Sequence, residues 1–172
     1  MVVWAEIPFI SRFINTKEAK EDTVRQMREL IMQNYNHPSI CFWGISNEIT
    51  MGEESDELVE NQRILQKLCH KLDPSRKTVL ANLTTVESQS EQNKITDLSA
   101  YNVYMGWYAG KVEDCGAWMD SLHKENSDMC TGISEYGADT NVQYHSDAPK
   151  RQDYTEEYQS YYHEKMLQAI QE

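Results

Sequence analysis

The stretch Trp43-Gly44-Ile45-Ser46-Asn47-Glu48 decides the fold that we expect for this chain, because it ends an apolar run on a glutamate. Far along the chain, Ile133-Ser134-Glu135-Tyr136-Gly137 repeats this pattern. Short runs of this kind predict buried strands, and α/β folds place their chemistry at the carboxyl ends of parallel strands. A glutamate at each of two such ends indicates acid/base and nucleophilic work on a glycosidic bond.

Five predicted strands alternate with helical segments along the chain. The strands are expected at residues 2–7, 40–45, 78–83, within 95–104 and at 131–136, and the helices at 15–36, 55–72, 112–124 and 153–172. Residues 84–94 carry little apolar content, so no helix is assigned there. Because a right-handed crossover returns each strand in the same sense, this alternation predicts an α/β fold with parallel strands. A doubly wound open sheet and a barrel both satisfy the pattern.

Local signals set the ends of the first two helices. Asn15, with Glu18 three residues later, has the spacing of a capping box. The first helix should stop before His37-Pro38, since the residue preceding a proline avoids helical angles. Ser55 opens the second helix, and the turn Asp73-Pro74-Ser75 ends it.

Composition narrows the class of partner. The 172 residues include 16 Lys and Arg against 28 Asp and Glu, which gives a formal net charge of −12. Nucleic acid and anionic membranes need a basic face, so neither is expected as a partner, and a neutral sugar fits better. The 4 cysteines form no C-x-x-C pair, so no metal site or disulfide framework is predicted. No glycine-rich phosphate loop follows a strand, and no cofactor is expected.

The opening residues Met1-Val2-Val3-Trp4-Ala5-Glu6 contain no basic leader and no long apolar stretch. Neither a signal peptide nor a membrane span is therefore expected in this segment. The compartment of a parent protein stays unknown, with the bacterial cytoplasm or periplasm as the expectation.

Four motifs, in order along the chain, resemble the catalytic barrel of glycoside hydrolase family 2, whose members include β-galactosidases and β-glucuronidases. Val3-Trp4-Ala5-Glu6-Ile7-Pro8 is similar to the family's third strand. Asn47-Glu48, with His37-Pro38-Ser39 before it, resembles the fourth strand, which carries the acid/base. The run Asn102-Val103-Tyr104-Met105-Gly106-Trp107-Tyr108 resembles the sixth strand, and Ser134-Glu135-Tyr136-Gly137-Ala138-Asp139 resembles the seventh, which carries the nucleophile.

The resemblance implies a TIM-type (β/α)8 barrel that is incomplete here. A complete barrel typically needs about 250 residues, against 172 in this chain, and about strands 3 to 7 with their helices are recognisable. Residues 1–172 would then be a partial catalytic barrel domain of a larger multidomain glycosidase. A partial barrel leaves open edges, so self-association through these edges is expected.

The same resemblance implies roles for two glutamates and one amide. Glu48 would be the general acid/base and Glu135 the nucleophile, with the two carboxyl groups about 5–5.5 Å apart as in retaining enzymes. Asn47 would hydrogen-bond the sugar 2-hydroxyl. The alternative reading of each glutamate is structural, as a strand-end carboxylate that caps the next helix or pairs with a lysine.

Three further residues are candidates for substrate binding. Tyr104 would aim its hydroxyl at the nucleophile, Trp107 would offer a plane for a pyranose ring, and Asn102 belongs to the same motif. Strand-end aromatic residues also serve as core or rim packing, which is the alternative for Tyr104 and Trp107.

The function expected from this reading is a retaining β-glycosidase that hydrolyses terminal β-linked hexosides by double displacement. A β-galactosidase is preferred, because the recognised motif positions contain no obvious basic residue to pair with a sugar carboxylate. β-Glucuronidase or β-mannosidase specificity is the alternative within the enzyme class. A catalytically silent barrel fragment with a structural role is the alternative outside it.

Overall fold

The computed structural model describes residues 1–51 and 54–171. Its five strands form one sheet in chain order, β1-β2-β3-β4-β5, and the pairs β1–β2 and β2–β3 are parallel. The strands are β1 (Val3–Glu6), β2 (Ile40–Asn47), β3 (Lys77–Leu83), β4 (Leu98–Val103) and β5 (Thr131–Tyr136). All five lie where the sequence predicted them, within a few residues at each end.

Four α-helices alternate with the strands: α1 (Lys17–Asn34), α2 (Asp56–Leu72), α3 (Asp114–Glu125) and α4 (Glu156–Gln171). Thr16 caps α1, because its Oγ1 accepts a hydrogen bond from Ala19 N at 3.2 Å. The predicted cap at Asn15 is therefore wrong by one residue. Its side chain instead accepts a bond from Lys20 Nζ at 3.0 Å. Ser55 caps α2 as predicted, through a 3.2 Å bond from Leu58 N.

No α-helix lies between β3 and β4 in the described chain, where a single-turn 3₁₀ helix, η1 (Glu91–Lys94), is found. This agrees with the sequence, in which the low apolar content of the segment left no helix assigned, because a full helix needs an apolar face to bury. Polar bonds hold the segment instead. The buried Asn82 donates from Nδ2 to Asn93 Oδ1 at 2.6 Å and to Ser99 Oγ at 3.1 Å.

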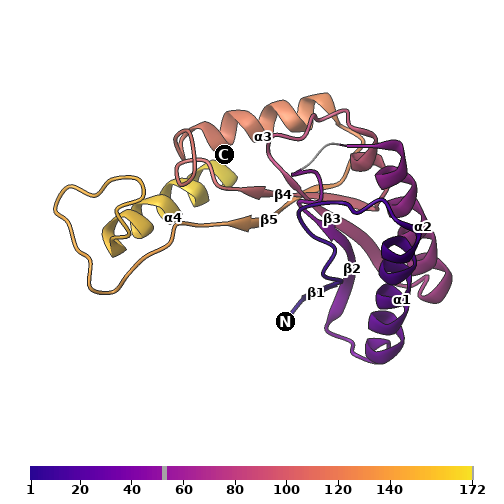
Figure 1. Cartoon of the computed structure of the whole chain (residues 1–172). Helices are drawn as coiled ribbons and strands as arrows, with labels where there is room; N and C mark the ends of the chain where they lie inside the picture. Colours follow the sequence, from indigo (N-terminus) through magenta and orange to yellow (C-terminus); the bar gives the residue numbers. More distant parts are fainter. Residues whose placement is uncertain (52–53, 172) are drawn as a thin grey trace. The chain divides into compact units, whose positions relative to one another are not determined.

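The chain divides into two compact units. The first comprises residues 1–101 and 128–132, and the second comprises residues 102–127 and 133–172. In the first unit α1 and α2 pack against each other, and α2 also contacts β2 and β3 (Figure 1). The core between helices and strands contains fully buried Met27 and Ile31 from α1, Trp43 and Ile45 from β2, and Leu65 from α2.

In the second unit α3 and α4 contact each other (Figure 1). Two tyrosines of α4 are buried and reach backbone carbonyls of the segment that begins in β4. Tyr158 Oη donates to Gly106 O, and Tyr162 Oη donates to Val103 O at 3.2 Å. These two tyrosines therefore pack α4 against that segment. Burial raises the pKa of the Tyr158 phenol, as expected for a group that stays a neutral donor.

All four cysteines are free thiols. Among the described residues, no group of three or more His, Cys, Asp and Glu side chains is placed to hold a metal ion. None of the helices described here is both long and apolar enough to cross a bilayer.

Candidate active site

Glu48 lies immediately after β2, at its carboxyl end. The β2–β3 register shifts just before it, since Gly44 pairs with Val79 and Asn47 with Ala81. Three residues of β2 thus oppose two of β3, which is a bulge that re-aims the residues after it. Glu48 itself has a φ of 49°, a left-handed conformation that glutamate rarely adopts. Such strain is concentrated at functional sites, so it marks Glu48 as a candidate.

Backbone hydrogen bonds fix this conformation from two neighbouring strands. Glu48 N donates to Ala81 O of β3 at 2.9 Å, and Met51 N donates to Glu48 O at 3.2 Å. On the other side, Asn47 N donates to Phe9 O at 3.0 Å and Asn47 O accepts from Ser11 N at 3.2 Å. The segment after β1 therefore supports the Asn47-Glu48 pair directly.

Glu135 lies in β5, in the second unit, with an exposed side chain. Tyr104, which follows β4, donates a hydrogen bond from its hydroxyl to Glu135 Oε2 at 2.7 Å. The hydroxyl was expected to aim at this carboxylate, and the contact is present. This hydrogen bond engages Oε2 of Glu135, so Oε1 is the oxygen that could react with a substrate.

A second bond joins the same two strands. Ser134 Oγ donates to Asn102 Oδ1 at 2.6 Å, and Asn102 is 3% exposed. The buried amide of Asn102 thus braces the residue next to Glu135. Substrate binding by Asn102 stays a prediction. Ser134 was not predicted to contribute, although its place beside Glu135 in the motif was a signal.

Trp107 is buried, at 2% exposure. Its ring packs edge-on against Tyr154, with centroids 5.2 Å apart, and lies 6.2 Å from the ring of Tyr158. These contacts favour the packing role, and stacking of Trp107 on a sugar stays a prediction. Tyr108, by contrast, is 63% exposed, and its ring lies 5.0 Å from that of Tyr104.

The long loop between β5 and α4 is fastened to the N-terminal turn of α4. His145 Nδ1 lies 3.0 Å from Glu157 Oε1, and Ser146 N donates to Glu157 Oε2 at 3.3 Å. The hydrogen bond to Glu157 raises the pKa of His145, and the same bond lowers the pKa of Glu157. Thr140 and Asn141 close the loop by donating to Tyr154 O.

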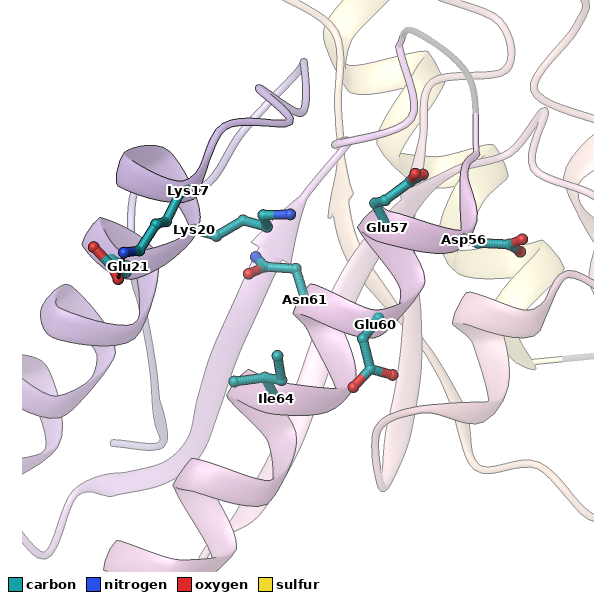
Figure 2. Close-up of a pocket in the computed structure, with 8 residues that line it drawn as sticks. All are labelled: Lys17, Lys20, Glu21, Asp56, Glu57, Glu60, Asn61 and Ile64. Atoms are coloured by element: carbon teal, nitrogen blue, oxygen red, sulfur yellow. Dashed lines mark ion pairs between the residues drawn. The ribbon is translucent and has the colours of Figure 1, made fainter.

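A cavity of about 470 Å³ opens between α1 and α2, as Figure 2 shows. Lysine, glutamate and aspartate side chains of the two helices surround it, together with Asn61 and Ile64. It contains none of the predicted site residues. This cavity belongs to the helical layer and is not the candidate active site.

The comparisons with known proteins agree with these motifs. A family model described as "Glycosyl hydrolases family 2, TIM barrel domain" matches residues 5–172. The chain therefore belongs to glycoside hydrolase family 2. The α/β prediction, with an incomplete TIM-type barrel, is confirmed.

Several of the relatives are β-glucuronidases. The chain is 35% identical, over its whole length, to a β-glucuronidase of Bacteroides fragilis, and covers 26% of that protein. It is 52% identical to an FMN-binding β-glucuronidase from Facaelibacterium prausnitzii L2-6, whose crystal structure matches 99% of the chain with a TM-score of 0.96; the match covers 26% of that structure. A putative β-galactosidase from Bacteroides fragilis matches with a TM-score of 0.89 at 32% identity, over 99% of this chain and 25% of that one. The chain spans about a quarter of the length of these relatives.

Proposed function

We propose that residues 1–172 are part of the catalytic barrel of a larger multidomain β-glucuronidase that acts with retention, with Glu48 as acid/base and Glu135 as nucleophile. The observation that carries the proposal is the Tyr104 hydroxyl bonded to Glu135 at 2.7 Å, in a chain that belongs to the family over residues 5–172. An exposed carboxylate that is oriented by a phenol suits a nucleophile. A carboxylate that only caps a helix would not need this partner.

The reaction runs in two displacements. The Glu135 carboxylate attacks the anomeric carbon, the bond from that carbon to the glycosidic oxygen breaks, and the oxygen takes the proton of Glu48 as it leaves. Water then attacks the anomeric carbon of the glycosyl–Glu135 ester and gives its proton to Glu48. The ester bond breaks, the carboxylate returns, and the sugar is released with its original anomeric configuration. The mechanism requires the two carboxyl groups to lie about 5–5.5 Å apart.

The other candidate residues complete the site around the sugar. Asn47, held by Phe9 and Ser11 through its backbone, is proposed to hydrogen-bond the 2-hydroxyl, a contact that strengthens in the transition state. Asn102 and Tyr104 are proposed to position Glu135, Asn102 through Ser134 and Tyr104 directly. Trp107 is proposed to support the rim of the site by packing against the ring of Tyr154.

The relatives favour a glucuronide over a galactoside as substrate. The galactoside preference rested on the lack of a basic residue in the recognised motifs, but several of the similar proteins are β-glucuronidases. β-Galactosidase activity is the second candidate, supported by the putative β-galactosidase structure and by a β-galactosidase of Thermoanaerobacterium thermosulfurigenes that is 33% identical over 78 residues. FMN binding is a property of one relative, and the expectation of no cofactor stays a prediction for this chain.

The roles of Glu48 and Glu135 can be tested by comparing substrates with good and poor leaving groups. The test uses the complete protein, of which we propose this chain to be a segment. Removing a general acid lowers the rate of cleavage far more for substrates with poor leaving groups than for substrates with good ones. Glu48→Ala should therefore lose activity on a methyl β-glucuronide by a much larger factor than on the 2,4-dinitrophenyl β-glucuronide. Glu135→Gln should lose activity on both, since no ester can form. Equal rates for wild type and Glu135→Gln would instead support the catalytically silent alternative.

The sugar specificity needs a separate measurement. We expect kcat/KM for 4-nitrophenyl β-glucuronide to exceed that for the matching β-galactoside and β-mannoside by at least about 100-fold, because a site that pairs a sugar carboxylate rejects analogues without it. The reverse order would establish a galactosidase or mannosidase and leave the roles of the two glutamates intact.

A further inference from the structure

A second cavity, of about 380 Å³, lies beside the segment that carries Glu48. Thr50, two residues after Glu48, forms part of its wall, and Thr85 and Glu87, which follow β3, form another part. Glu48 is itself bonded to β3 through Ala81. The cavity is therefore built at the carboxyl ends of the two strands that fix Glu48, entirely within the first unit.

The wall of this cavity is rich in groups that bind hydroxyls. Thr50, Thr85 and Ser90 supply hydroxyls, and Glu54 and Glu87 supply carboxylates. Ser90 Oγ is bonded to the Glu54 carboxylate, which ties the two sides of the wall together. The size is in the range of sites for small molecules.

Gln92 closes the buried side of this cavity. The residue is 1% exposed, and its Oε1 accepts a long 3.5 Å bond from Gln62 Nε2. Its Nε2 has less than 1 Å² of accessible surface, so a ligand oxygen does not reach it. The polar groups open to a ligand are therefore the hydroxyls and carboxylates of the wall.

We propose that this cavity binds the leaving group of the substrate, and that the natural leaving group is a neutral, polyhydroxylated sugar residue. The inference rests on the proposed function, because a general acid must touch the oxygen that joins the sugar to its leaving group. Two carboxylates in the wall oppose an anionic leaving group. A purely apolar leaving group would leave the hydroxyls of the wall unpaired.

The test compares two leaving groups on the same glycone in the complete protein. One substrate is the 4-nitrophenyl β-glycoside that the enzyme accepts, and the others are disaccharides in which this glycone is β-linked to glucose, galactose or N-acetylglucosamine. Thr85→Val should lower kcat/KM for the preferred disaccharide about 3–10-fold, the value of one hydrogen bond. It should change kcat/KM for the nitrophenyl substrate less than about 2-fold.

Thr84→Val is the matched control, since the neighbouring threonine is not part of the wall, and it should leave both substrates unaffected. Thr85 is exposed, so its variant should fold. Equal losses on both substrates, no loss on the disaccharide, or a wild type that cleaves none of the disaccharides would overturn the inference. Failure of the proposed function is distinguished by Glu135→Gln, which would then retain activity on the nitrophenyl substrate.

Discussion

The hydrogen bond from Tyr104 to Glu135 fixes the carboxylate that we propose as nucleophile. Tyr104→Phe keeps the ring and removes the donor, so Glu135 would rotate among several orientations. A hydrogen bond to a charged group contributes about 1.5–3 kcal/mol, which corresponds to a loss of about 10–150-fold in kcat/KM on an aryl glycoside.

The control for this variant is Tyr154→Phe, because Tyr154 contacts Trp107 through its ring and would keep that contact. It should retain activity within about 2-fold. Similar activities for the two variants would show that the Tyr104 hydroxyl does not assist the nucleophile. Circular dichroism of both proteins checks that neither has lost its fold.

Asp73, fully buried at the end of α2, predicts a specific dependence of stability on pH. Burial would raise its pKa, but bonds from Ser75, Arg76 and Trp43 outweigh burial and lower the pKa to about 2. The folded pKa lies below the unfolded one, so the stabilisation is full above about pH 4 and is lost as the pH falls toward 2. It amounts to about 2–3 kcal/mol for a shift of this size.

We expect Asp73→Asn to lower the free energy of unfolding at pH 7 by about 3 kcal/mol, since it leaves the Arg76 guanidinium without its carboxylate at 2.6 Å. The loss should shrink between pH 4 and pH 2, where the wild type loses the same interaction. Urea unfolding at several pH values measures it. Asp22→Asn, which removes an exposed partner of Arg25, is the control, and an equal effect of the two variants would contradict the prediction.

At the scale of elements, the β1–β2 pairing depends on a glycine. Gly44 of β2 pairs with Glu6 of β1, and a Cβ at this position would lie 2.2 Å from Trp4 Nε1 and 2.3 Å from Glu6 Cβ. Neither contact is possible without a shift of β1. Overpacking of this kind costs about 1–3 kcal/mol, so Gly44→Ala should lower the free energy of unfolding by that amount.

Gly132 provides the matched control for this prediction, because it lies in β5 and a Cβ there would meet nothing within 4 Å. Gly132→Ala should be neutral or slightly stabilising, since alanine has less backbone entropy to lose on folding. The midpoints of thermal unfolding of both variants and of the wild type test this prediction. Equal midpoints for Gly44→Ala and wild type would mean that β1 can move aside at no cost.

The elements show what sequence reasoning could and could not predict. Apolar period and cap residues located β5 and the start of α2 closely, because local chemistry determines those features. The Arg76 contacts were missed, since its guanidinium donates to Tyr35 O, His37 O and Ile40 O, which lie 36 to 41 residues away in the sequence. No local pattern encodes bonds of this range.

The site shows the same division between local and non-local information. Motifs made both glutamates candidates, which stays a prediction, and the expected contact of Tyr104 with Glu135 is present. The positive φ of Glu48 was not predictable, because it results from a β2 bulge that is defined only against β3. The burial of Trp107 depends on Tyr154 and Tyr158, which lie about fifty residues away.

At the scale of the whole molecule, β1 and β5 are the outer strands of the described sheet. Outer strands carry unpaired backbone groups, which favour pairing with a second chain. The net charge of −12 opposes this association at low salt, and added salt screens the repulsion. We therefore expect light scattering to give a mass of at least two chains in 0.5 M salt, and a lower mass in low salt.

Two lysine substitutions can show whether the sheet edge is responsible for this association. Val2, beside β1, is 69% exposed, and Met32 on α1 is 64% exposed, so Val2→Lys and Met32→Lys make the same change of charge and polarity at different places. A lysine at an edge strand hinders pairing, so Val2→Lys should reduce the mass in 0.5 M salt and Met32→Lys should not. Equal effects would assign the association to general surface charge. A monomeric wild type that unfolds cooperatively in 0.5 M salt would show that the segment is stable with both edges open.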